Sequence, residues 1–73
     1  LNAALAAIDR GDKVSAEKYL KKAGTGAEVD NARGCLAVLN EDYETAKLYF
    51  QKAVAGGLKG AQENLDKINK IVE

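Results

Sequence analysis

The feature that most constrains how this chain can fold is an internal repeat with a spacing of thirty residues. In the segment from Asp42 to Ala53, small and aromatic residues recur at the i, i+3, i+4 and i+7 positions of one helix face. The two matching sets are Ala16, Tyr19, Leu20 and Ala23 in the first copy, and Ala46, Tyr49, Phe50 and Ala53 in the second. A repeat of this length in a chain of 73 residues predicts two copies of one small helical unit.

Composition and the positions of glycine predict five helices. The chain contains no proline, and it is rich in Ala, Leu, Lys and Glu, which are strong helix formers. Six of the seven glycines fall between periodic segments, and the exception is Gly34. These breaks predict helices at about residues 2–10, 13–23, 26–39, 43–55 and 58–73. Because the connections are short, consecutive helices are expected to be antiparallel neighbours.

Residues at the first breaks match known helix-capping patterns. Gly11 and Gly24 are expected to end the first two helices, because glycine adopts the left-handed conformation without a steric penalty. Asp12 and Asp42 are expected to be N-caps, since a carboxylate there accepts hydrogen bonds from free backbone N–H groups. The two aspartates are thirty residues apart, so the pattern predicts the same turn in both units.

The remaining two boundaries are expected to use other residues. Thr25 and Glu28 have the spacing of a capping box that would open the third helix. At the end of that helix, Asn40 and Glu41 replace the glycine stop of the first unit. Asparagine tolerates the left-handed conformation nearly as well as glycine, so Asn40 is expected to adopt it.

The second unit carries a small residue in the string Asn31-Ala32-Arg33-Gly34, then an Asp-Tyr turn, and then small, aromatic and small residues on its second helix. This pattern resembles the tetratricopeptide repeat, a helix-turn-helix unit of about 34 residues. The segment from Tyr49 to Leu65 also looks like a Sel1-like repeat, a related unit. The repeat positions in this chain are Ala4, Asp12, Ala16, Leu20, Ala23, Gly34, Asp42, Tyr43, Ala46, Phe50 and Ala53.

The resemblance implies an all-α fold in which antiparallel helix hairpins form a right-handed superhelix. Repeats at about residues 1–24 and 25–57 would be followed by a capping helix at about 58–73, in one domain. Gly34 would let the second helix of its hairpin approach closely at Ala46, as Ala4 and Ala16 would do in the first unit. Phe50 would then fill the space between this hairpin and the next helix. Because the chain contains no methionine, we expect it to be an excerpt of a longer protein.

Composition also argues against several functions. Eleven basic and eleven acidic residues cancel, which argues against a nucleic-acid or anionic-membrane surface. No apolar run approaches the roughly 20 residues that span a bilayer. The chain has no histidine, which is the commonest general base and metal ligand. Cys35, the only cysteine, is expected to pack between helices and not to act as a nucleophile. The sequence therefore predicts no active site, cofactor or metal.

The resemblance implies that a protein or peptide partner would bind along a groove lined by the first helix of each hairpin. This groove would be apolar at its N-terminal end and charged at the other. The residues expected in it are Leu1, Leu5, Ile8, Asn31, Cys35, Val38, Lys67 and Lys70, with Glu63 beside the two lysines. The lysine and asparagine positions of a co-chaperone carboxylate clamp are occupied by Leu1, Leu5 and Ala32, so a clamp of that type is not expected.

The sequence leaves several functions open. The first is a non-enzymatic interaction or assembly module that binds a partner segment or a neighbouring domain. The second is a structural spacer in a bacterial cell envelope, since short-period repeats of this kind resemble those of envelope lipoproteins. The third is a regulatory domain attached to an enzyme. The apolar residues of the first helix also leave open contact with an upstream repeat, or self-association through the N-terminal end.

Overall fold

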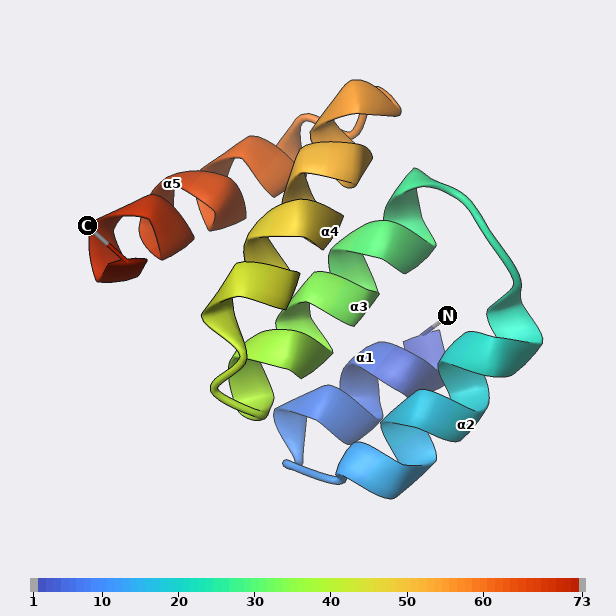
Figure 1. Cartoon of the computed structure of the whole chain (residues 1–73). Helices are drawn as coiled ribbons and strands as arrows, with labels where there is room; N and C mark the ends of the chain where they lie inside the picture. The colour runs from blue at the N-terminus through green and yellow to red at the C-terminus, as the bar shows by residue number, and fades with distance from the viewer. Residues whose placement is uncertain (1, 73) are drawn as a thin grey trace.

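The computed structural model describes the backbone of residues 2–72 and the side chains of residues 3–71, so Leu1 lies outside the described residues. Within this range the chain is all-helical, with five helices and no strand, as the sequence predicts (Figure 1). The helices are α1 (Asn2–Asp9), α2 (Lys13–Ala23), α3 (Ala27–Leu39), α4 (Tyr43–Ala55) and α5 (Gly60–Val72).

The central element of the arrangement is α3. It packs along α4 on one side, and it contacts α1 and α2 on the other (Figure 1). The fifth helix packs mainly against α4. The compact body measures 30 × 24 × 15 Å along its principal axes. A surface that involves both α1 and α5 must therefore pass over α3.

The turn between α1 and α2 joins the two helices through a single aspartate. Gly11 has a φ of +75°, and its N–H donates to the carbonyl of Ile8 at 2.9 Å. The Asp12 N–H donates to the carbonyl of Ala7 at 2.8 Å, which completes a Schellman-type end to α1. The Asp12 carboxylate then accepts from the Ser15 N–H at 3.1 Å and opens α2. A hydrogen bond from the Ser15 side chain is the first cause of a lowered pKa at Asp12, and this backbone bond is the second. The predicted cap is confirmed.

The turn between α3 and α4 has the same hydrogen bonds, but its left-handed residue is Glu41, with a φ of +60°. The N–H groups of Glu41 and Asp42 donate to the carbonyls of Val38 and Ala37, each at 2.9 Å. The expectation that Asn40 would take this conformation is wrong, since its φ is −84°. In both turns the left-handed residue directly precedes the capping aspartate. Because Asp42 is the cap of α4, the left-handed residue of this turn is Glu41.

The beginning of α3 also differs from the prediction. The N-cap is Gly26, and no side chain caps the helix, so the Thr25–Glu28 capping box is wrong by one residue. Gly26 has a φ of +134°, a conformation that side-chain-bearing residues rarely adopt. Because the chain enters α3 through this glycine, Thr25 lies one position too early to serve as the N-cap.

The buried side chains form two clusters, one on each side of α3. The first cluster joins α1, α2 and α3, and the second joins α3, α4 and α5. Most repeat positions on the second helices are buried in both units, whereas Ala23 and Tyr43 are only partly buried. The first cluster consists of Ala4, Ala7, Ala16, Leu20, Val29, Ala32 and Leu36, and the second of Ala37, Ala46, Phe50 and Ile68.

Gly34 makes room for the ring of Phe50. A Cβ atom built on Gly34 would lie 2.5 Å from Cε1 of Phe50. The second helix does approach Gly34 closely, and the three atoms nearest to the added Cβ all belong to the Phe50 side chain. The ring reaches this space because it is long enough to extend back across the interface. Thirty residues earlier the equivalent residues are Ala4 and Leu20. In that first unit the first helix carries Ala in place of the smaller Gly, and the second helix carries Leu in place of the larger Phe.

Replacing Gly34 with alanine should destabilise the fold, although alanine favours a helix by about 1 kcal/mol. Overpacking against the Phe50 ring costs about 1–3 kcal/mol, so we expect a net loss of up to about 2 kcal/mol in urea denaturation. In a Phe50→Leu background, which copies the first unit, the same change should be stabilising. Gly60→Ala is the control, because nothing lies within 4 Å of its new Cβ. Equal effects of Gly34→Ala in both backgrounds would contradict this packing.

Replacing Glu41 with glycine should raise the free energy of unfolding by about 1 kcal/mol. A left-handed conformation costs a non-glycine residue roughly 1–2 kcal/mol, and the greater entropy of glycine in the unfolded chain offsets part of the gain. Asn40→Gly is the matched control and should lower stability, since Asn40 is already in a favourable conformation. Urea denaturation of the two variants checks this, and the opposite order would place the left-handed residue at position 40.

Candidate functional site

The structure brings three of the predicted groove residues together around one apolar pocket. Cys35 and Val38 enter it from α3, and Lys67 enters it from α5. The pocket has a volume of about 220 Å³, larger than the ~150 Å³ apolar cavity that accommodates benzene in an engineered protein. We call it the α3–α5 pocket, and its lining residues are Cys35, Val38, Phe50, Asn64, Lys67, Ile68 and Ile71.

The inner wall of the α3–α5 pocket belongs to the hydrophobic core, whereas its rim is exposed. Phe50 and Ile68 are each only 2% exposed, and both belong to the second core cluster. Ile71, one helical turn further along α5, is 54% exposed. An apolar side chain on the pocket would therefore contact the packed core on one side and Ile71 on the other.

A polar contact between helices lies at one end of this pocket. The Asn64 side-chain amide donates to the side-chain oxygen of Asn31 at 2.9 Å, and this bond connects α5 to α3 across 33 residues of sequence. Asn31 was expected in the groove, and its side-chain oxygen accepts this bond. Its role in the structure is to hold α5 beside α3, and so to help shape the pocket.

The electrostatic environment of the pocket differs between its two sides. Burial raises the pKa of the Cys35 thiol, and the nearby Asp9 carboxylate on α1 raises it further. The thiol is therefore protonated at neutral pH, and it contributes to the pocket as a small apolar group. On the α5 side, Lys67 is exposed. Among residues 3–71, no carboxylate lies within ion-pair distance of Lys67.

The other predicted groove residues do not line the pocket. Ile8 packs partly buried against the first core cluster, so its apolar side chain is explained by the core. Leu5 is 38% exposed on α1, and Lys70 is exposed on α5.

Sequence reasoning missed four residues of the pocket as binding residues. Phe50 was interpreted as a core position, which it is, but its side chain also lines the pocket. Ile68, Ile71 and Asn64 were not singled out. Their signal in the sequence was spacing, because residues 64, 67, 68 and 71 follow the i, i+3, i+4, i+7 pattern of one helix face.

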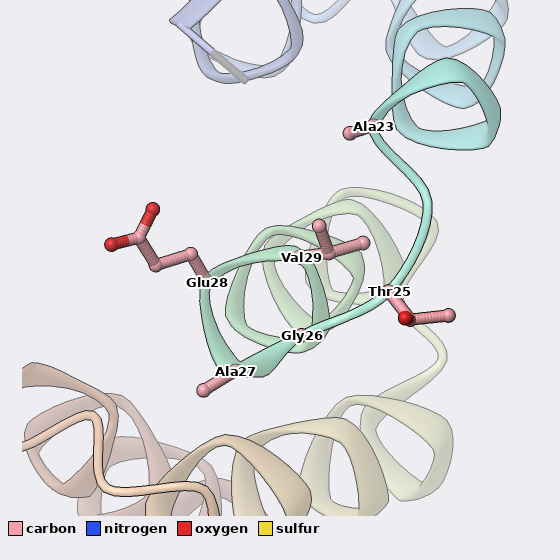
Figure 2. A pocket seen from close by; sticks show the side chains of 6 residues that line it. All are labelled: Ala23, Thr25, Gly26, Ala27, Glu28 and Val29. Atoms are coloured by element: carbon pink, nitrogen blue, oxygen red, sulfur yellow. The ribbon is translucent and has the colours of Figure 1, made fainter.

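A second recess, of about 550 Å³, is a less suitable binding site. It lies where the connection from α2 enters α3, and Figure 2 shows its lining residues. The side chains of Thr25 and Glu28 lie on opposite sides of this segment and do not converge on a common point (Figure 2). Specific sites for small molecules combine an enclosing wall with a few convergent polar groups. Here such convergence is missing.

A third hollow, of about 240 Å³, lies between α2 and α4 above α3. Arg33 and Glu17 form an ion pair across it at 3.6 Å, and the Lys52 amine lies 5.3 Å from the centre of the Tyr49 ring. Exposed ion pairs contribute about 0–1 kcal/mol, and exposed cation–π contacts about 0.5–1 kcal/mol. These contacts explain the side chains in the hollow as part of the solvated surface of the helices.

Within the described part of the chain, no three His, Cys, Asp or Glu side chains are grouped as metal ligands. None of the described helices is long and apolar enough to cross a bilayer. Comparison of the chain with protein-family models, with curated proteins and with solved structures gave no match. The candidate site is therefore defined by geometry alone: an apolar pocket between α3 and α5 with a lysine on its rim.

Proposed function

We propose that this chain is a small protein-interaction module of the helical-repeat type. In this proposal α1–α2 and α3–α4 are two tetratricopeptide-like or Sel1-like hairpins of a right-handed superhelix, and α5 is the closing helix. A partner segment binds on the surface of α3 and α5 and places a side chain in the α3–α5 pocket. The observation that supports it is the convergence of Cys35, Val38 and Lys67, three residues expected to bind a partner, on one apolar pocket.

The internal repeat explains why a pocket is present in the second unit. Cys35 and Val38 correspond to Leu5 and Ile8 thirty residues earlier, and each is smaller than its counterpart. Smaller side chains on α3 leave space above the Phe50 ring. In this proposal the pocket binds and does not catalyse, since its walls are apolar and its thiol is held in the protonated form.

The N-terminal end offers less support for the alternative of an upstream repeat or a second copy. Leu36 of α3 is buried against the preceding helix pair, and its equivalent thirty residues earlier is Ala6, which is exposed. Arg33 likewise corresponds to the exposed Ala3. The face of α1 that an upstream unit would cover therefore has little apolar surface to bury, and we place partner binding at the α3–α5 pocket.

Peptide display tests this proposal. A library of random twelve-residue peptides is selected on the purified chain, and the selected peptides are then tested on two pocket variants and two control variants. Cys35→Leu should abolish binding, because it fills the pocket with the larger residue of the first unit. Val38→Lys should also abolish it, by placing a charge in the apolar wall.

Val14→Leu and Leu5→Lys are the matched controls for these two changes. Val14 is 82% exposed on α2, away from the pocket, and Leu5 is exposed on α1. Both controls should bind the selected peptides as the parent does, and circular dichroism should show the same helicity for all four variants. Failure to enrich any peptide, or binding that survives Cys35→Leu and Val38→Lys, would contradict the proposed function.

A further inference from the structure

We propose, building on the proposed function, that the α3–α5 pocket selects an acidic partner segment, in which one large apolar side chain enters the pocket and an adjacent carboxylate contacts Lys67. The apolar part of this inference follows from the wall of the pocket. Phe50, Ile68 and Ile71 supply a core-like surface that is large enough for an aromatic or branched aliphatic side chain.

The acidic part follows from the charges around the pocket. Lys67 is the only charged residue among those that line it. No carboxylate among residues 3–71 lies within ion-pair distance of this amine, so a carboxylate from a partner would not have to displace one of them. Lys70 lies one turn further along the same helix and is also exposed. A carboxylate beside the apolar anchor would thus approach the two lysines of α5, with Glu63 about one turn before Lys67 on the same helix.

The acidic residue Asp9 makes the charge on the α1 side of the pocket opposite to the charge on the α5 side. Asp9 lies close enough to Cys35 to act on the thiol, on the α1 side of α3, whereas Lys67 approaches the pocket from α5. A carboxylate placed towards α1 would be repelled by Asp9, and one placed towards α5 would be attracted. The partner segment is therefore oriented with its acidic end over α5.

Three amidated and acetylated heptapeptides test this inference. The first is Gly-Ser-Phe-Asp-Asp-Ser-Gly, the second has Lys in place of both Asp residues, and the third has Ala in place of Phe. Each is titrated into the ¹⁵N-labelled chain, and amide chemical shifts are followed by NMR. The acidic peptide should shift the amides of Cys35, Val38 and Ile68, and should bind about fivefold more tightly than the lysine peptide. The alanine peptide should leave these amides unshifted.

Lys67→Glu should remove or reverse the preference between the acidic and lysine peptides. The control is Lys59→Glu, which makes the same charge change at an exposed residue that does not line the pocket. It should keep most of the preference. Raising the salt concentration to about 1 M should also reduce the difference between the two peptides, because charges separated by more than about 3 Å are then screened.

Equal affinity of the acidic and lysine peptides, or shifts that map away from the pocket, would overturn the inference. A selected set of display peptides that still depends on Cys35 and Val38 would then leave the proposed function intact. If the pocket amides shift when the concentration of the chain is raised without peptide, a second copy of the chain occupies the pocket. That result would likewise contradict the proposal of an acidic partner segment.

Discussion

The contact between the Phe50 ring and the Gly34 backbone is the interaction on which the rest of the structure depends. The ring is 2% exposed, and it lies where a side chain on Gly34 would otherwise stand. Glycine is unfavourable inside a helix by about 1 kcal/mol, and burial of a phenylalanine side chain contributes about 1.5–3 kcal/mol. The net gain joins α3 to α4. Ile68 of α5 belongs to the same cluster, so the Phe50 ring also gives α5 a surface to pack on.

The pocket is a consequence of this same contact. The ring that fills the space next to Gly34 is also accessible on its other side, where Cys35 and Val38 are too small to cover it. α5 closes the pocket through Ile68 and is held beside α3 by the Asn31–Asn64 hydrogen bond. Core packing and the candidate binding site therefore share residues, and a partner would contact the side chains that hold the three helices together.

The sequence predicted the helices and the turn chemistry well where local rules decide them. The caps at Asp12 and Asp42 and the stop at Gly11 were correct because each depends on hydrogen bonds within a few residues. Two local predictions were nevertheless wrong by one residue, the capping box at Thr25 and the left-handed residue at Asn40. Glu41 adopts the left-handed conformation because it directly precedes the capping Asp42, against its own preference. The partner of Gly34 depends on how far a ring extends from the neighbouring helix.

The candidate site could be predicted only in part. Cys35, Val38 and Lys67 were expected to face a partner, and they do line one pocket. Ile8 was assigned to the same surface, and it packs partly buried against the first core cluster. An apolar residue on a helix of a small bundle can serve the core or a partner, and the sequence pattern does not distinguish the two. The roles of Asn64 and Ile71 depend on how α5 crosses α3, and no pattern within α5 determines that crossing.

The most direct test of this account is a ¹³C-edited NOESY spectrum of the chain. The account predicts cross-peaks from the Phe50 ring protons to the α-protons of Gly34 and to the methyl groups of Ile68, with the Gly34 resonances shifted by the ring current. These contacts would establish the packing of α3, α4 and α5 and, with it, the inner wall of the pocket. A spectrum in which the ring shows cross-peaks to neither Gly34 nor Ile68 would contradict the account.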